Sequence, residues 1–244
     1  LFYATYSEGF RPGILNRPGG RVAGNYTVPY AVATDEVNNH EFGWKLTSDD
    51  RRFRFNANAF FVEIEKLQTT IFDPSIANLF FSENAVDAEV YGLEGEFTYL
   101  PPNLEGLTLT GAFSFLDSEV KEVLVPTNDV ENGVSLAYAP DLQLNFRARY
   151  EWELGNGMQA HFMPSLIYSD KQYSDIITIN RDEIDSYTLV NLSAGISNDI
   201  WSGEFFIDNV TDEYAETARN FVNDVERITP ARPLTFGLRF ARNF

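Results

Sequence analysis

Apolar and polar residues alternate through much of this chain, and this alternation constrains the fold more than any other feature. In the segment 107–115 the odd positions hold Leu107, Leu109, Phe113 and Phe115 around one glycine, whereas the even positions hold Thr, Ala and Ser. Successive side chains of a β-strand point to opposite faces, so the pattern predicts a strand with one apolar face. The pattern recurs at 38–46, 53–61, 90–99, 141–152, 189–196 and 234–244. About ten candidate strands, without helix start and stop signals, predict an all-β fold.

The connections between these strands are of two alternating kinds. The short ones occupy 48–52, 101–106, 155–157 and 198–203, and the long polar ones occupy 11–34, 68–84, 117–134, 170–184 and 213–232. In an antiparallel sheet, all short turns then lie at one end and all long loops at the other. Outer-membrane barrels have short periplasmic turns and long extracellular loops. The sequence therefore predicts a transmembrane antiparallel β-barrel, and it has no apolar run long enough for a transmembrane helix.

Composition agrees with a barrel and excludes several classes of site. The 21 Phe, 12 Tyr and 3 Trp are many for a chain of net charge −18, and a barrel places such rings in girdles at both membrane interfaces. The negative charge would repel a phosphate backbone, so no nucleic-acid partner is expected. Because the chain has no cysteine, disulfides, thiolate metal sites and cysteine nucleophiles are excluded. No metal site and no cofactor are expected.

A barrel around water turns its apolar face to lipid and its polar face to the lumen. We expect lipid contacts for Leu107, Leu109, Phe113, Phe115, Leu142, Leu144, Phe146, Val190, Leu192 and Ile196. We expect Thr108, Gln143, Arg147, Asn191 and Ser193 to face the lumen. The carboxylates Glu94 and Glu96 share one strand face, and we expect them to meet cations on neighbouring strands, such as Lys45, Arg54, Arg147 or Arg149.

The final segment ends in an apolar ladder. Phe236, Leu238, Phe240 and Phe244 alternate with Gly, Arg and Ala, and Arg242 is the one departure from the apolar series. A last amphipathic strand that ends in Phe resembles the signal read by the outer-membrane assembly machinery. We therefore predict that these four residues act in barrel assembly, with Phe236, Leu238 and Phe240 facing lipid.

Four short motifs carry a family resemblance. They are YATYSEGFRPG at 3–13, EFGWK at 41–45, YGLEGE at 91–96 and NVTDEY at 209–214. In this order, and followed by the terminal Phe244, they resemble the carboxy-terminal half of a TonB-dependent outer-membrane receptor. The resemblance extends over residues 1–244.

The resemblance implies a larger protein. Such receptors have a barrel of about 22 strands around a plug, so 1–244 would supply about ten wall strands, and the plug and TonB box are absent from this chain. The opening at Leu1 without Met agrees with a segment of a longer protein. The implied function is ligand-gated active import of a siderophore, glycan or cobalamin-like nutrient across the bacterial outer membrane. The implied partners are membrane lipid, the TonB complex, the barrel assembly machinery and the ligand.

Aromatic and arginine side chains in or beside the long loops are the ligand-binding candidates. Rings can stack on a sugar or an aromatic chelator, and guanidinium groups can bind carboxylates through two hydrogen bonds. The candidates are Phe10, Arg11, Arg17, Tyr26, Tyr30, Phe72, Phe80, Phe81, Tyr173, Arg181, Arg219 and Phe221.

Two other classes of protein remain open from the residues alone. An autonomous ten-stranded outer-membrane enzyme, such as a protease, would need a catalytic cluster above the membrane. Both histidines, His40 and His161, fall within strands, and no catalytic motif accompanies them. A soluble β-rich binding module would leave the final apolar strand without a role. We therefore expect a transport protein without enzyme activity.

Overall fold

The computed structural model describes residues 1–16, 22–23, 26–73, 77–125, 130–222 and 225–242, with the backbone alone at 22–23, 26, 71–73, 77–80 and 221–222. The elements are β1 (Phe2–Arg11), β2 (Ile14–Leu15), β3 (Val22–Ala23), β4 (Tyr26–Thr27), β5 (Ala31–Val32), β6 (Asp35–Thr47), β7 (Phe53–Asp73), β8 (Ala77–Tyr99), β9 (Leu107–Val123), β10 (Leu142–Gly155), β11 (Met158–Ser169), β12 (Gln172–Tyr173), the 3-10 turn η1 (Thr178–Asn180), β13 (Glu183–Ile184), β14 (Tyr187–Ser197), β15 (Trp201–Asp208), β16 (Glu216–Val222), β17 (Val225–Pro230) and β18 (Thr235–Arg242). Apart from one 3-10 turn, the regular secondary structure of the described residues is therefore all β, as the sequence predicts.

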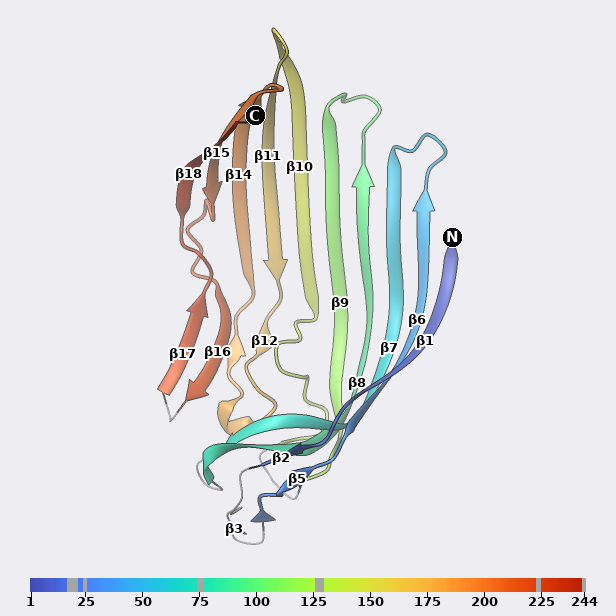
Figure 1. Cartoon of the computed structure of the whole chain (residues 1–244), viewed down its shortest axis with the longest axis vertical. Coiled ribbons are helices and arrows are strands. Elements are labelled where there is room, and N and C mark those ends of the chain that lie inside the picture. Colours follow the sequence, from blue (N-terminus) through green and yellow to red (C-terminus); the bar gives the residue numbers. More distant parts are fainter. Residues whose placement is uncertain (17–21, 24–25, 74–76, 126–129, 223–224, 243–244) are drawn as a thin grey trace.

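One large sheet dominates the molecule. Ten strands follow one another in the order β1-β6-β7-β8-β9-β10-β11-β14-β15-β18, and every pair of neighbours is antiparallel. Figure 1 shows a tall curved wall with the turns β6–β7, β8–β9 and β10–β11 at the upper end and the long connections at the lower end. The predicted antiparallel barrel wall and the predicted separation of short turns from long loops are confirmed.

The cross-strand register separates a polar from an apolar face. Phe97 and Phe146 both lie beside Gly111 in the sheet, and their rings are 6.4 Å apart. The Phe97 ring extends over Gly111, where a Cβ atom would lie only 2.4 Å from it. Small residues at such positions let rings from neighbouring strands lie flat on the wall. The register thus places the residues predicted to face lipid on one face of the sheet and those predicted to face the lumen on the other.

The long connections are more ordered than expected. The range 68–84 was predicted to be a polar loop, but β7 and β8 remain paired as far as Asp73 and Ala77. β9 continues to Val123, and β16 and β17 form a hairpin inside 213–232. The threonines and isoleucine at 69–71 favour extended backbone, and a paired ribbon satisfies backbone hydrogen bonds that a loop would leave to water. In Figure 1 the extended β7–β8 hairpin bends across the loop end of the wall.

A cluster of buried apolar residues lies at this loop end, where several connections meet the wall. It consists of Val28, Phe81, Ala85, Val86, Val120, Val130, Ile176 and Ile177. The members come from the first connection, the β7–β8 hairpin, β9 and the two following connections. Side-chain burial therefore fixes the connections over the end of the sheet. The helical part of the described chain offers no element long and apolar enough to cross a membrane.

Candidate functional site

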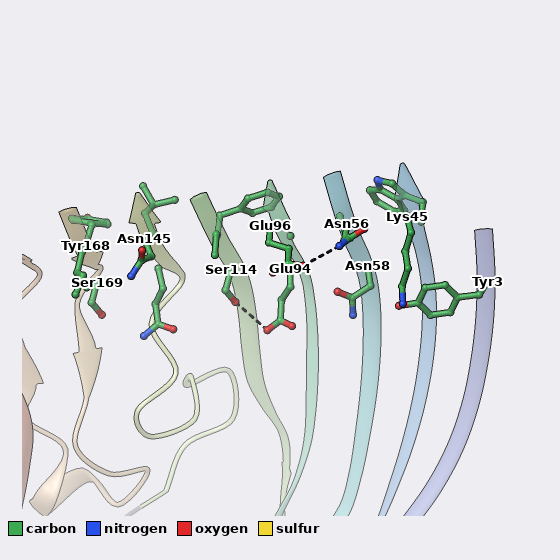
Figure 2. A pocket seen from close by; sticks show the side chains of 18 of the residues that line it. Tyr3, Lys45, Asn56, Asn58, Glu94, Glu96, Ser114, Asn145, Tyr168 and Ser169 are labelled. Atoms are coloured by element: carbon green, nitrogen blue, oxygen red, sulfur yellow. Dashed lines mark hydrogen bonds between the residues drawn. The ribbon is translucent and has the colours of Figure 1, made fainter. Parts of the chain in front are cut away.

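The inner face carries a broad recess with many polar side chains, which runs from near the short-turn ends of β6, β7 and β8 to the loop ends of β10, β11 and β14. Its volume is about 560 Å³, and Figure 2 shows the side chains that reach into it from neighbouring strands. They include Tyr3, Lys45, Asn56, Asn58, Glu94, Glu96, Ser114, Gln143, Asn145 and Ser169. Amides, hydroxyls and carboxylates lie here beside apolar lining residues, so this wall can make hydrogen bonds to a hydrated partner.

Hydrogen bonds within the recess differ from the predicted ion pairs. Asn56 Nδ2 donates to Glu96 Oε1 over 2.9 Å, and Ser114 Oγ donates to Glu94 Oε1 over 3.4 Å. Among the salt bridges of the described residues, neither glutamate meets a cation. The prediction that Lys45, Arg54, Arg147 or Arg149 neutralises Glu94 and Glu96 is therefore wrong, because cross-strand register brings an amide and a hydroxyl to these carboxylates.

The cations expected there have other neighbours. Lys45 Nζ lies 5.8 Å from the centre of the Tyr3 ring, and Tyr3 donates a hydrogen bond to Glu41 over 2.7 Å. The guanidinium of Arg149 binds Glu151, two residues along the same strand, at 2.9 Å. Glu94 and Glu96 therefore present oxygen atoms that accept hydrogen bonds on the inner wall.

At the loop end, Arg11 is a structural residue rather than an open ligand contact. It forms a two-pronged ion pair with Asp35, whose side chain is only 1% exposed, and the Arg11 Nε–Asp35 Oδ2 distance is 2.7 Å. The N–H of Gln68 also donates to this carboxylate over 3.2 Å. Burial opposes ionisation of Asp35, but hydrogen bonds from Arg11 and Gln68 outweigh it and lower the pKa of the carboxyl.

Gln68 connects this ion pair to the β7–β8 hairpin. Its side-chain amide donates to the carbonyls of Pro12 and Ala33 over 3.1 and 2.9 Å, and Arg11 donates to the Gln68 carbonyl over 3.0 Å. The Asn84 side chain accepts a hydrogen bond from the Ala33 N–H over 2.7 Å. These contacts anchor the base of the hairpin to the first connection.

Tyr173 and Arg181 come together beside a second recess, of about 510 Å³, at the loop end of β9 to β11. The guanidinium of Arg181 lies 3.9 Å from the centre of the Tyr173 ring, and it donates to the Ser135 carbonyl over 3.0 Å. Burial lowers the pKa of Arg181 and raises that of neighbouring Asp175. Asp117, Glu119, Asp141 and Lys171 complete the polar part of this recess, which we call the mouth pocket.

Arg219 is held by acidic residues rather than directed into open space. It makes hydrogen bonds of 2.6 and 2.7 Å to Glu216, and it also meets Asp182 and Glu226 at 3.4 and 2.8 Å. The hydrogen bonds with Glu216 raise its pKa further. Tyr138 donates a hydrogen bond to the Arg219 carbonyl, so this residue joins three connections.

The other predicted binding residues have mixed positions. Phe10 and Tyr30 are 73% and 56% exposed at the loop end, whereas Phe81 is buried in the apolar cluster. Tyr26, Phe72, Phe80 and Phe221 lie in strands whose backbone alone is described there, and Arg17 lies outside the described residues. Among the predicted residues whose side chains the structure describes, Tyr173 and Arg181 are the two that line the mouth pocket.

The final strand presents its apolar ladder to the outer face. Phe236, Leu238 and Phe240 are 72%, 82% and 75% exposed, and they alternate with Thr235, Gly237 and Arg239. The Phe206 ring lies under Gly237, on the opposite face from the ladder. Phe244 lies outside the described residues.

Sequence reasoning missed Asp35, Gln68 and Asn84, which hold the loop end together. Their partners are 24 to 57 positions away along the chain. The only available signal was the position of Asp35 at the start of a strand, and it did not identify a partner. Long-range polar contacts of this kind require the sheet register before they can be recognised.

Comparisons with known proteins agree with this architecture. The sequence model of the family described as "TonB dependent receptor-like, beta-barrel" matches residues 1–210. No curated protein matches the chain significantly.

Several solved structures share the fold. They include the ferric yersiniabactin uptake receptor FyuA from Yersinia pestis, with 15% identity over 100% of this chain and 35% of that chain and a TM-score of 0.76. The ferric preacinetobactin receptor BauA from Acinetobacter baumannii has 20% identity over 98% of this chain and 33% of that chain, with a TM-score of 0.69. The pyoverdine outer-membrane receptor FpvA from Pseudomonas aeruginosa PAO1 has 18% identity over 100% of this chain and 34% of that chain, with a TM-score of 0.67.

This chain therefore spans about a third of the length of the receptors that it resembles. The outer-membrane setting excludes a soluble binding module, and the matched family consists of receptors rather than enzymes. On the family match over 1–210, together with the ten-stranded wall, the chain belongs to the β-barrel family of TonB-dependent outer-membrane receptors.

Proposed function

We propose that this chain forms the carboxy-terminal part of a larger barrel that imports a scarce nutrient across the outer membrane. The single observation that carries the proposal is the polar recess on the inner wall, because a wall rich in amides and carboxylates faces water or a polar partner. The match to the receptor family gives that wall a transport context.

The remainder of such a protein would supply the energy coupling. An outer-membrane receptor has no nucleotide to hydrolyse, so active import needs energy from the inner membrane through TonB. We propose that a plug and a TonB box elsewhere in the protein perform this step. The acceptors Glu94 and Glu96, together with Asn56, Asn58 and Asn145, would hydrogen-bond to the plug across trapped water.

The ligand class best supported is a ferric siderophore. The similar structures are receptors for ferric yersiniabactin, ferric preacinetobactin and pyoverdine. In the mouth pocket, the stacked pair Tyr173–Arg181 offers a ring face to such a ligand, and Lys171, whose ammonium lies 3.0 Å from Glu183, lines the same recess. The exposed rings of Phe10 and Tyr30 would add contacts at the same end of the wall.

The test is uptake by the complete protein in cells that lack their own siderophore receptors. We expect accumulation of at least one radioiron-labelled siderophore of the catecholate, hydroxamate or mixed type, and we expect its loss when TonB is deleted. Lys171→Gln should weaken binding, whereas Lys66→Gln, a lysine variant on β7 outside the mouth pocket lining, should not. Labelled cobalamin and oligosaccharides tested in parallel distinguish the other ligand classes. Accumulation that persists without TonB would contradict active import.

A further inference from the structure

A shallow apolar groove crosses the outer face close to the short-turn end of the wall. Its volume is about 520 Å³, and it extends over β10, β11, β14, β15 and β18. Its floor consists of the small residues Ala160, Ala194 and Gly203. The side chains around it are Trp152, Ile196, Trp201, Phe205, Leu238 and Phe240.

The sheet register explains why a groove forms here. Trp152 pairs with Ala160, Ala160 with Ile196, Ile196 with Gly203, and Gly203 with Phe240. A single row across five strands therefore begins and ends with a large ring, and the small residues Ala160 and Gly203 lie on either side of Ile196 within it. A Cβ atom at Gly203 would meet only the Trp201 ring, at 3.9 Å, so the space above this glycine is open.

The groove lies in the half of the wall that faces the periplasm. Ala160 is two residues from the first residue of β11, and Trp152 is three residues from the last residue of β10, where the short turn 155–157 follows. Short turns of outer-membrane barrels are periplasmic, and Trp rings at strand ends mark the membrane interface. An apolar groove that is continuous with the lipid-facing surface is filled by the hydrocarbon of that leaflet.

A positive charge adjoins the groove at its periplasmic end. Arg242 pairs with Trp201, and strand alternation places it on the same outward face as Phe240. This arginine is the one departure from the apolar series of the final strand. A guanidinium has five donors, so it binds a phosphate while keeping another contact.

We propose that this groove binds one glycerophospholipid of the periplasmic leaflet, with an acyl chain over Ala160, Ala194 and Gly203 and the phosphate at Arg242. The acyl chain restores dispersion contacts that a narrow empty groove between rings would lose. The side chains around the groove limit it to a chain-like occupant. A stable protein partner would need roughly 1,000 Å² of buried interface.

The experiment uses the complete protein, purified in detergent and examined by native mass spectrometry with added dioleoylphosphatidylglycerol or dioleoylglycerol. We expect one tightly retained phosphatidylglycerol. Gly203→Leu and Ala194→Leu fill the floor and should each weaken retention about tenfold, the effect of roughly two buried methylene groups. Ala148→Leu is the matched control, because Ala148 pairs with Leu109 on the same outer face but does not line the groove.

The headgroup contact has its own variant. Arg242→Gln should reduce the preference for phosphatidylglycerol over dioleoylglycerol, while the binding of dioleoylglycerol stays unchanged. Heat-modifiable gel mobility confirms that each variant is folded. If Gly203→Leu fails to fold, lipid retention by Ala194→Leu tests the groove in its place. Equal lipid retention by the floor variants and by Ala148→Leu overturns the proposal. The proposal is also overturned if the groove holds a protein instead of a lipid and Gly203→Leu displaces that protein.

Discussion

The imidazole of His161 on β11 meets the carboxylate of Glu204 on β15 at 3.1 Å, although β14 lies between their strands. The contact is possible because the intervening position is Gly195, which pairs with both residues. Arg239 of β18 then reaches the other oxygen of Glu204 at 2.5 Å. One row of side chains thus connects four strands on the inner face.

Gly195→Ala is expected to break this row. A Cβ atom there would lie 2.6 Å from the His161 ring and 2.8 Å from the Gly203 carbonyl oxygen, so side chain and backbone must both move. We expect the free energy of unfolding to fall by about 1–3 kcal/mol. Urea unfolding of the complete protein in lipid vesicles measures it, with Gly203→Ala as the control, since that position is open. Equal stability of the two variants would show that the row is not close-packed.

Arg11→Gln is expected to loosen the loop end rather than to remove a ligand contact. It leaves the buried carboxylate of Asp35 without its cation, which costs about 1–3 kcal/mol locally. Amide hydrogen exchange at 66–86 should accelerate, whereas Arg227→Gln on the exposed strand β17 should leave it unchanged. Because the pKa of Asp35 is lowered, this anchor persists at neutral pH and is lost only as pH falls through that lowered pKa. If Arg11→Gln leaves hydrogen exchange at 66–86 unchanged but weakens ligand binding, Arg11 is a ligand-binding residue as first predicted.

Glu83 is expected to make the β7–β8 hairpin pH-sensitive. It lies between Phe81 and Ala85 on the buried side of β8, its Oε2 atom has no hydrogen-bond partner, and burial raises its pKa to about 7. A carboxyl whose folded pKa is raised stabilises the fold most at low pH, so hairpin stability should fall between about pH 4.5 and pH 7 and then level off.

Glu83→Gln removes this titration. Because the side chain is only partly buried, we expect a gain of about 1–2 kcal/mol at pH 8 and little change at pH 4.5. Hydrogen exchange of 66–86 at both pH values, corrected for the intrinsic rate, measures the difference. Glu65→Gln, on the paired strand β7, is the control, because Glu65 pairs with exposed Glu36. A pH dependence that survives in Glu83→Gln would assign the effect to another group.

The fold was accessible from sequence because alternation and turn length are local signals. Segments such as 107–115 and 141–152 show their two faces directly, and turns such as 155–157 give the hairpin order. The end of strand pairing was not accessible, because beyond the membrane a polar ribbon and a polar loop have the same composition. The range 68–84 was therefore assigned to the wrong class.

The candidate site was less predictable for a related reason. Arginine and aromatic residues in loops suit ligand binding and loop packing equally well. Arg11 and Arg219 are occupied by carboxylates of this chain, and Phe81 is buried. Only the three-dimensional register separates these residues from Tyr173 and Arg181, which do reach a recess.

Deletion of Phe244 is expected to reduce delivery to the outer membrane sharply while leaving the finished barrel nearly as stable. The resemblance of the final strand to an assembly signal motivates this prediction, since one terminal ring contributes little to the wall. Surface-exposed protein in cells is compared with refolding yield in detergent for the complete protein and for the deletion. Phe236→Ala serves as a control that removes a ring from the same strand but keeps the terminus. Normal surface levels after the deletion would show that Phe244 is an ordinary aromatic residue of the membrane interface and not part of an assembly signal.

If this chain is a membrane wall, its strands alternate between lipid and lumen faces. The absence of cysteine allows single cysteines to be introduced at 112–116 of β9 and spin-labelled in the complete protein in lipid vesicles. Labels at 113 and 115 should be accessible to oxygen in the hydrocarbon, and labels at 112, 114 and 116 to a water-soluble nickel complex. Accessibility with a period of two and opposite phase for the two reagents is the predicted result. Uniform access of the nickel complex to all five positions would show that neither face of β9 contacts lipid.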